Sequence, residues 1–242
     1  MEALIGTEQG HPMSPELFKT YLLDLSKELN ETYDLLVPEL NDIKLSHLLW
    51  ADDLVLLALD MKSLQILIDR VYMFCLDWGL TVNIGKTAVM VFNKSGKLLL
   101  ESHTFKYGDV SVPSARSYCY LGIVFSLSGS FALATDELRK KGLKAYFALK
   151  RMIDLSALSP KIVFKLFDAL ILPVVSYGSV IWLQSTQFTR TLLRSTNNKT
   201  KLKQMAADPM EKLHLKFLKW TLLVHKKCTN LTCYGDSGRY AL

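Results

Sequence analysis

The sequence has few cysteines and no long uninterrupted apolar run, and both absences narrow the class of protein. Four of the 242 residues are cysteine, too few and too scattered for the framework of a disulfide-stabilised secreted domain. No secretory leader is recognisable at its start. We therefore expect an intracellular protein, in the nucleus or the cytoplasm and not secreted.

The longest apolar stretch, residues 169–183, is too short to cross a bilayer and is interrupted by Pro173, Ser176, Gly178 and Ser179. We interpret it as a buried core element and expect no membrane partner. Half of the residues are hydrophobic and 21% are charged, which is typical of a packed globular protein with one large or two small domains.

Charge is distributed unevenly along the chain. Residues 1–60 contain 12 acidic residues against three lysines, whereas residues 139–242 contain 19 lysines and arginines against five acidic residues. This asymmetry is typical of a site that gathers metal ions beside a surface that binds polyanions. The alternative is that both segments are ordinary solvated surface.

Two adjacent carboxylates, Asp52 and Asp53, interrupt the apolar segment HLLWADDLVLLA (residues 47–58). A buried ionised carboxylate is costly unless a partner compensates it, and no lysine or arginine lies nearby in the sequence. Alternation over residues 43–49 and the apolar run 54–58 predict a hairpin with both carboxylates at its tip or just beyond. Adjacent aspartates on a turn supply oxygen ligands for Mg²⁺, although most such pairs are solvated turn residues.

The remaining pattern predicts an α+β fold. Helical periodicity runs over residues 17–29, after Ser14 as cap and Pro15 at the first position, and over residues 63–78, before a stop at Gly79. Further helices are expected from Leu138 and after Pro160. Short strands are expected at residues 80–82, 88–92, 105–107, 110–112 and 118–125, with a turn at Gly108-Asp109. The expected architecture is an antiparallel sheet backed by helices, followed by a mainly helical region.

Six segments, in the same order, resemble the reverse transcriptases of non-LTR (LINE-type) retrotransposons. They are GTEQGHPMSPELF (6–18), WADDLVLLA (50–58), GLTVNIGKTAVMVF (79–92), YLGIVFS (120–126), LPVVSYGSVIW (172–182) and CYGDSGRYAL (233–242). The resemblance implies a partial polymerase palm over residues 1–130 and a thumb-like helical region over 131–183. A polar loop over 184–209 and a C-terminal helical segment and tail over 210–242 would follow.

The resemblance also implies roles for single residues. Asp52 and Asp53 match the catalytic, metal-binding aspartates, with Mg²⁺ as cofactor and Mn²⁺ as a substitute. The residues matching the nucleotide and template contacts are Gln9, Gly10 and Lys86. Those on the thumb helix that would contact the nucleic-acid backbone are Lys140, Lys144 and Arg151.

Each role has a structural alternative. Gln9 could cap the next helix, Lys86 could be an exposed turn lysine, and the basic helix face could be solvated surface. Two positions depart from the family pattern: Trp50 replaces the usual tyrosine or phenylalanine, and His11 replaces the usual cysteine or aspartate.

The resemblance implies an RNA template, a DNA primer and deoxynucleoside triphosphates as partners of the intact parent protein. It also implies a further catalytic aspartate upstream, whereas five residues precede Gly6. We therefore interpret the chain as a palm-and-thumb portion with little or no polymerase activity alone, unless a separate N-terminal half supplies that aspartate. A non-catalytic nucleic-acid-binding remnant, a host-retained fragment and a poorly folding decayed product remain alternatives.

The motif His225-x-x-Cys228-x-x-x-x-Cys233, with His214 as the nearest fourth candidate, has the ligand types of a structural zinc site. Its cysteine spacing is wider than such sites usually have, so we do not expect zinc.

Overall fold

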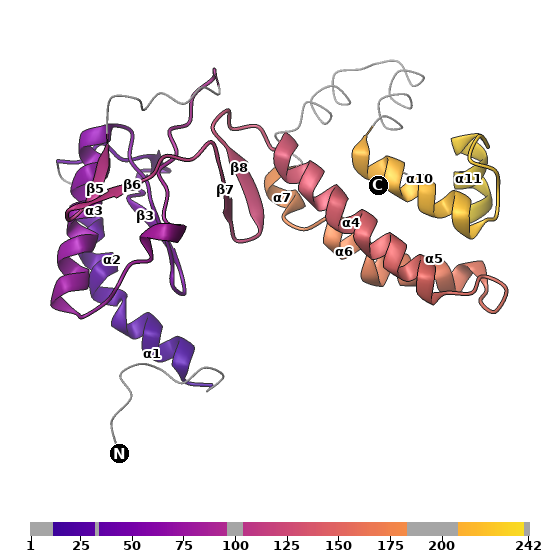
Figure 1. The fold of residues 1–242 in the computed structure, drawn as a ribbon, viewed down its shortest axis with the longest axis horizontal. Helices are drawn as coiled ribbons and strands as arrows, with labels where there is room; N and C mark the ends of the chain where they lie inside the picture. Colours follow the sequence, from indigo (N-terminus) through magenta and orange to yellow (C-terminus); the bar gives the residue numbers. More distant parts are fainter. Residues whose placement is uncertain (1–11, 32–33, 96–103, 183–207, 240–242) are drawn as a thin grey trace. The chain divides into compact units, whose positions relative to one another are not determined.

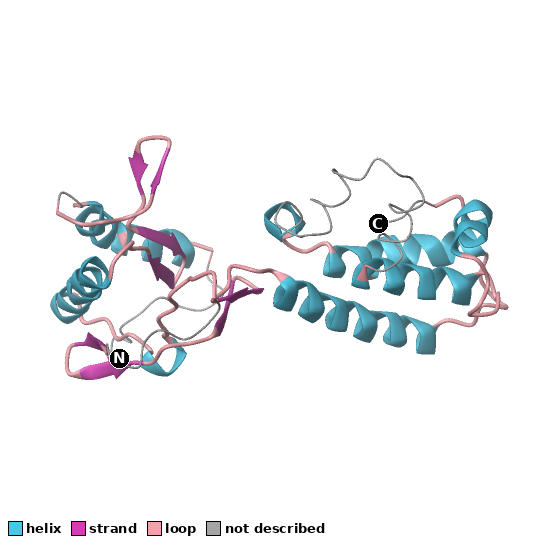
Figure 2. Cartoon of the chain, turned by 90° about the horizontal axis from the view of Figure 1, so that it is seen from above, coloured by secondary structure: helices cyan, strands magenta, loops and turns pink. Residues whose placement is uncertain are grey.

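The structure, a computed structural model, describes residues 12–31, 34–95, 104–182 and 208–239. The chain forms two compact units, one from residues 1–89 and 99–115 and the other from 90–98 and 116–242. Helices and short antiparallel strands occur together, which confirms the α+β class (Figures 1 and 2). The palm and thumb boundaries, which are assignments of function, stay a prediction.

The N-terminal unit is organised around three helices, α1 (Ser14–Tyr21), α2 (Leu23–Asn30) and α3 (Met61–Asp77). α3 begins where the Asp60 carboxylate accepts a hydrogen bond from the Ser63 amide at 2.8 Å, which is a regular N-cap. It ends just before Gly79, whose φ of +65° suits glycine. The predicted helix over residues 63–78 is confirmed.

The main core of this unit lies between α2 and α3. Leu25 and Leu29 of α2 pack with Leu67, Val71 and Phe74 of α3, and all five are buried. The two helices are also joined by a polar contact: the Arg70 guanidinium donates to the carbonyl oxygens of Glu28 at 3.0 Å and Glu31 at 2.6 Å. These carbonyls lie at the end of α2, where the Glu28 carbonyl also accepts from the Glu31 amide at 3.3 Å, and where the last carbonyls of a helix lack their regular helical partners.

The strands form four antiparallel hairpins in chain order. They are β1 (Glu39–Leu40) with β2 (Ile43–Lys44), β3 (His47–Trp50) with β4 (Asp53–Leu56), β5 (Phe105–Tyr107) with β6 (Val110–Val112), and β7 (Ser117–Tyr120) with β8 (Ile123–Ser126). In the part of the chain that the structure describes, each hairpin is a separate two-stranded sheet rather than part of one larger sheet. The hairpin predicted around Gly108-Asp109 has the predicted bounds.

Three local predictions are wrong. Residues 80–82 form no strand, because Leu80 and Val82 pack on the α2–α3 core without a partner strand. In residues 88–92 the only strand-type pairing is a single bridge from Val89 to Ser114. The strand expected over 118–125 is instead the β7–β8 hairpin, because the chain reverses at Leu121 and Gly122.

The helix start at Ser14 also differs from the prediction. Residues 17–29 form two helices, α1 and α2, and the N-cap position of α1 is Met13, one residue before the predicted cap. Ser14 is therefore the first helical residue.

The C-terminal unit is mainly helical. Its described helices are α4 (Ala132–Met152), α5 (Pro160–Leu170), α6 (Leu172–Val175), α7 (Ser179–Trp182), α10 (Pro209–Thr221) and α11 (Asn230–Ser237). α4 packs against α6 and α10, and its buried Tyr146 and Leu149 join a core that includes Phe167 of α5 and Phe217 of α10. Both helices predicted here, from Leu138 and after Pro160, are confirmed.

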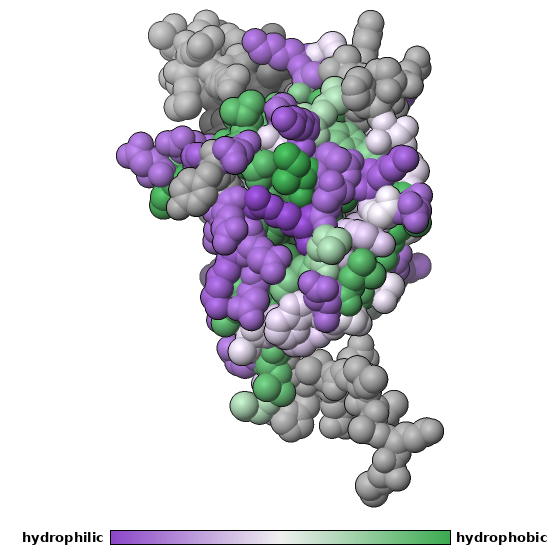
Figure 3. Space-filling model, turned by 90° about the vertical axis from the view of Figure 1, so that its left-hand side faces the viewer, coloured by the Kyte–Doolittle hydropathy of each residue, from purple (hydrophilic) through white to green (hydrophobic). Residues whose placement is uncertain are grey.

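Among the described residues, no helix has the length and apolar character needed to span a membrane. On the face of the molecule shown in Figure 3, polar side chains surround scattered apolar ones. Such a mixture is usual for a protein surface exposed to water. The polar segment predicted over 184–209 lies almost entirely outside the described residues.

Candidate active site

The two carboxylates lie at the turn of the β3–β4 hairpin. Leu49 pairs with Leu54 and Trp50 pairs with Asp53, so that Ala51 and Asp52 form a two-residue loop. The hairpin predicted from the apolar pattern is therefore confirmed, with Asp52 in the loop and Asp53 at the first position of β4.

This hairpin is anchored in the N-terminal unit from its base, the His47–Leu56 pair, to the Leu49–Leu54 pair next to the turn. Leu49, Leu54 and Leu56 pack against the α2–α3 core. The His47 ring lies between two serine hydroxyls, with its Nε2 2.9 Å from Ser26 Oγ of α2 and its Nδ1 2.9 Å from Ser46 Oγ. The turn that carries the carboxylates is thus held at its base by packing and hydrogen bonds.

The tip of the hairpin is exposed. Asp52 and Asp53 are both exposed, and Trp50 has 66% of its surface accessible to solvent. Within the described ranges, neither carboxylate forms an ion pair with a lysine, arginine or histidine. Since neither carboxylate is buried, the pair carries no desolvation cost that an internal partner would have to offset.

The backbone at this turn is strained. Ala51 has a φ of +51°, a left-handed conformation that costs a residue with a Cβ roughly 1–2 kcal/mol. Glycine or asparagine is the usual choice at such a position of a two-residue hairpin loop. Strained backbone of this kind is often found at functional sites, where the surrounding structure maintains it.

Of the residues predicted to bind the nucleotide and the template, the structure describes only Lys86. Gln9 and Gly10 lie outside the described residues. Lys86 is exposed at the end of the short helix η1 (Ile84–Lys86), and its amide donates to the carbonyl of Asn83 at 3.0 Å. It belongs to the same unit as Asp52 and Asp53.

The three basic residues predicted to contact the nucleic-acid backbone are all exposed on α4. Lys140 differs from the other two because its ammonium group lies 3.0 Å from a carboxylate oxygen of Asp136 and 2.8 Å from one of Glu137. These pairs raise the pKa of Lys140 and partly neutralise its charge. Lys144 and Arg151 form no ion pair with the residues that the structure describes.

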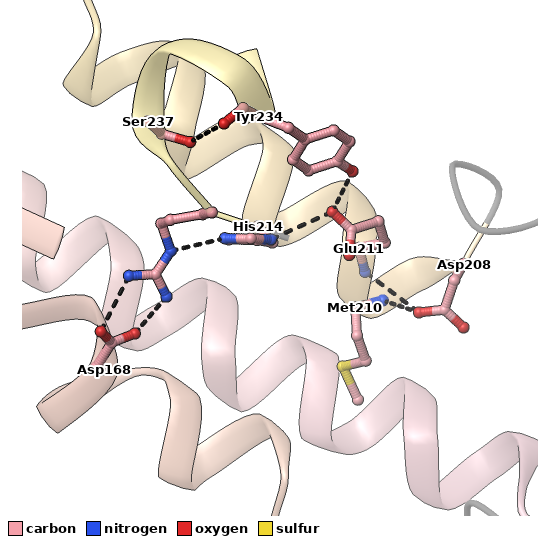
Figure 4. Close-up of polar contacts among 8 residues, drawn as sticks. Asp168, Asp208, Met210, Glu211, His214, Tyr234 and Ser237 are labelled. Carbon is pink, nitrogen blue, oxygen red and sulfur yellow. Dashed lines mark hydrogen bonds and ion pairs between the residues drawn. The ribbon is translucent and has the colours of Figure 1, made fainter. Parts of the chain in front are cut away.

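A chain of polar contacts that the sequence did not reveal connects α10, α11 and α5 (Figure 4). Tyr234 donates to Oε1 of the buried Glu211 at 2.5 Å, and His214 Nδ1 lies 3.2 Å from the same oxygen. Arg239 Nε donates to His214 Nε2 at 3.3 Å, and both Nη atoms of Arg239 donate to the Asp168 carboxylate. Both ring nitrogens of His214 are therefore engaged within the protein.

This contact chain gives the segment CYGDSGRYAL a structural role. Tyr234 and Arg239 both belong to that segment, and through them the segment is connected to α10 and α5.

In the described ranges, no group of three or more histidine, cysteine, aspartate or glutamate side chains is arranged to hold a metal ion.

Residues 3–125, just over half of the chain, match the family model described as reverse transcriptase (RNA-dependent DNA polymerase). The chain belongs to this family. The match contains the β3–β4 hairpin with Asp52 and Asp53, and it ends within β8.

The relatives are one transposon-derived protein and two retrotransposon polyproteins. The chain is 27% identical over 146 residues to a transposon-derived protein of Caenorhabditis elegans, an alignment that covers 59% of this chain and 50% of that protein. It is 30% identical over 130 residues to the Pol polyprotein of a type-2 retrotransposable element of Drosophila melanogaster, and 30% over 131 residues to that of the type-1 element R2 of Nasonia vitripennis.

Each of these two alignments covers 51% of this chain and 12% of the polyprotein, so the chain corresponds to a small part of those relatives. No solved structure matches the chain at comparable significance. The chain is therefore a reverse transcriptase-like domain of retrotransposon origin, and the resemblance to retrotransposon reverse transcriptases is confirmed at the level of the family.

Proposed function

We propose that the β3–β4 hairpin is the carboxylate-bearing part of a nucleotidyl-transfer site in a retrotransposon reverse transcriptase. The observation that carries the proposal is the placement of Asp52 and Asp53, which are exposed at the tip of a hairpin whose base is anchored in the core. In this proposal the parent protein extends a DNA primer on an RNA template, with deoxynucleoside triphosphates as substrates.

The residue types at the tip fit a magnesium ion. Mg²⁺ prefers oxygen ligands, and proteins usually bind it through one or two carboxylates while waters and substrate phosphates complete the coordination. Asp52 and Asp53 would hold the ion, and Mn²⁺ could replace it. When bound, the ion would stabilise the negative charge that develops during phosphoryl transfer.

The chain's own residues would position the nucleic acid. Gln9 and Gly10 would lie near the nucleotide and template, and Lys86 near the triphosphate. Lys144 and Arg151 would contact phosphates of the template–primer duplex, which is a sequence-independent and salt-sensitive interaction. Lys140 would first have to leave Asp136 and Glu137, so we assign it the weakest contact of the three.

We further propose that these 242 residues polymerise little or not at all by themselves. A site for two metal ions takes carboxylates from at least two chain segments, and the hairpin is one segment. The second proposed function is therefore non-catalytic nucleic-acid binding, which the surplus of 19 lysines and arginines over five acidic residues in residues 139–242 favours.

The test combines metal binding with primer extension. Mn²⁺ binding to the full chain is measured by electron paramagnetic resonance, for the wild type, for Asp52→Asn/Asp53→Asn and for Asp42→Asn. Asp42 is a matched control, because it is another exposed aspartate in the two-residue turn of a hairpin, β1–β2. We expect the double variant to lose Mn²⁺ binding and the control to retain it.

Equal Mn²⁺ binding by all three proteins would contradict the assignment of Asp52 and Asp53. Primer extension on an RNA template, run on the same samples, separates the two functions. Extension by the wild type that disappears in the double variant would contradict our proposal that the chain is inactive alone. Salt-dependent RNA binding without extension would support the non-catalytic function.

A further inference from the structure

A cleft in the C-terminal unit, outside the residues that match the reverse transcriptase family, is lined mainly by lysines. Its volume is about 480 Å³, within the range of ligand-binding cavities. It lies where the last turn of α4 meets α10 and the segment between α10 and α11. The lining residues are Lys150, Lys212, Leu215, Lys216, Lys219, Trp220, Val224, Lys226 and Asn230.

The charge of this cleft is not compensated by its walls. Five of the nine lining residues are lysines and none is acidic. Within the described ranges, none of the five lysines forms an ion pair with a carboxylate. The one acidic side chain of α10, Glu211, is buried against His214 and Tyr234 instead. The cleft therefore has a positive potential suited to an anion of several charges.

The spacing of three of these lysines suits a linear polyanion. Lys212, Lys216 and Lys219 are four and three residues apart on α10, so they follow one face of the helix. At about 1.5 Å per residue, they cover roughly 10 Å along the helix axis. One strand of a duplex rises about 3.4 Å per phosphate along its axis, so a row of this length is long enough to contact several phosphates of one strand.

The cleft also has an aromatic wall that packing holds in place. Trp220 lines the cleft and meets Tyr146 of α4 edge to face, with ring centroids 5.8 Å apart. The ammonium group of Lys216 lies 4.5 Å from the centre of the Phe147 ring, which fixes the position of that lysine. An aromatic ring beside a row of cations is the combination that single-stranded nucleic acids use, because bases stack while phosphates pair with the cations.

We propose that this cleft binds a single strand of nucleic acid, with its phosphates on the lysines of α10 and a base against Trp220. The proposal rests on the second proposed function, nucleic-acid binding by the basic residues 139–242, and does not depend on catalysis by Asp52 and Asp53. The contacts proposed are with phosphates and with the face of a base, which RNA and DNA share, so RNA and DNA strands bind with similar affinity. A duplex binds more weakly, because its bases are stacked inside and cannot reach Trp220.

Fluorescence anisotropy of labelled oligonucleotides of roughly 12 nucleotides tests the proposal with the full chain. The probes are single-stranded RNA, single-stranded DNA and a DNA duplex, each titrated between about 50 and 200 mM salt. The cleft variant is Lys212→Gln/Lys216→Gln/Lys219→Gln. The matched control is Lys141→Gln/Lys161→Gln/Lys165→Gln, which removes three exposed lysines from other surfaces of the same unit and changes the net charge equally.

We expect the cleft variant to bind both single strands about tenfold or more weakly, while the control keeps its affinity within about threefold. Each phosphate contact contributes about 0.7 to the slope of log affinity against log salt, so the cleft variant should lose about 2 from that slope. Equal losses in the two triple variants would overturn the proposal, because binding would then follow net charge alone. Preference for the duplex, or tighter binding of inositol hexakisphosphate than of the oligonucleotide, would overturn it as well.

Two further variants complete the experiment. Lys212→Arg/Lys216→Arg/Lys219→Arg preserves the charge and should bind as the wild type does, and an unchanged melting temperature of the glutamine variant shows that its loss of binding is not a folding defect. Trp220→Phe keeps an aromatic ring against Tyr146 but should lower the quenching of tryptophan fluorescence by the bound strand, because Trp220 is the tryptophan that lines the cleft, and unchanged quenching would contradict the stacked base. Mn²⁺ binding at the hairpin tip and oligonucleotide binding by the α10 variants are separate measurements, so that failure of the proposed catalytic site and failure of this cleft are distinguishable.

Discussion

Arg239 donates to both carboxylate oxygens of Asp168, 71 residues earlier in the chain, and its Nε donates to the buried ring of His214. The contacts continue through His214 to Glu211 and Tyr234 (Figure 4). One end of this contact chain is accessible to solvent, because the Asp168 side chain is 45% exposed. The other end is buried, because the Glu211 side chain is 2% exposed. The two ends should therefore contribute unequally to stability.

We expect Tyr234→Phe to lower the free energy of unfolding by about 1.5–3 kcal/mol, because it removes a hydrogen bond to a buried carboxylate. Burial and the contact with Glu211 raise the pKa of Tyr234, so its hydroxyl is a donor throughout the neutral range. Asp168→Asn should cost about 1 kcal/mol or less, because water reaches the Asp168 end of this ion pair and asparagine can still accept from Arg239. Urea denaturation of both variants measures the difference, and equal losses would contradict this account.

Gly142 and Gly235 should respond oppositely to substitution by alanine. A Cβ at Gly142, in α4, would collide with Val175 of α6 and would lie 2.8 Å from a methyl group of Leu213 in α10. Both neighbours are buried, so overpacking should cost about 1–3 kcal/mol. A Cβ at Gly235, in α11, meets nothing within 4 Å, and Gly235→Ala should stabilise that helix by about 0.5–1 kcal/mol. The change in melting temperature of each variant is the measurement, and a stabilising Gly142→Ala would refute the close packing.

The His47 ring should make the N-terminal unit less stable in mild acid. Burial lowers the pKa of His47 below its ordinary value of 6.5. The unfolded chain therefore binds this proton more readily, so the stability contributed by the neutral ring is complete above about pH 6.5 and is lost as the pH falls toward the lower folded pKa. Hydrogen exchange of peptides from β3 and α3, compared at about pH 7.5 and pH 5.5 after correction for intrinsic rates, measures the loss.

The controls for His47 separate its titration from its hydrogen bonds. His47→Gln should reduce the dependence on pH, whereas Ser46→Ala should lower stability at every pH and keep that dependence. Asp60 does not interfere, because hydrogen bonds from Ser63 hold the pKa of its carboxyl below 3.8, so that its contribution is lost at lower pH. An unchanged dependence on pH in His47→Gln would show that another group is responsible.

Leu121→Asn should stabilise the β7–β8 hairpin. Leu121 has a φ of +46° and Gly122 one of +81°, the conformation in which Asn-Gly is the preferred pair. The Tyr177 hydroxyl donates to the backbone carbonyl of Leu121 at 2.8 Å, and this bond survives the substitution. We expect a gain of about 0.5–1 kcal/mol. The matched control is Leu133→Asn, at an exposed leucine in α4, which should lower the melting temperature because asparagine is a poorer helix former.

The sequence predictions were accurate where a structure depends on residues close together in the chain, and less accurate elsewhere. α3 and α4 were predictable because their apolar residues repeat with the helical period, and the β5–β6 hairpin because Gly108-Asp109 is a recognisable turn. The β7–β8 turn was missed because Leu121 is an unusual turn residue and the apolar run conceals the reversal. Gly122, with its positive φ, was the signal that could have indicated it.

The candidate site divides in the same way. The hairpin tip with Asp52 and Asp53 is a local feature of adjacent residues, so the alternation before it and the short apolar run after it were enough to place it. The lysine cleft requires α4 and α10 to pack together, and no spacing within one segment reveals that contact. The spacing of Lys212, Lys216 and Lys219 was visible in the sequence, but their convergence with Lys150 was not.

The N-terminal unit is discontinuous, since residues 90–98 belong to the other unit and residues 99–115 return to the first. During synthesis from the N-terminus, α3 therefore emerges from the ribosome well before β5, the strand that packs on it. Until then, apolar residues such as Ile68, which is buried beside Phe105 and Val112, remain in water. More than 25 residues are synthesised between the end of α3 and the start of β5. During that time the apolar face of α3 is exposed, and a chaperone can bind to it.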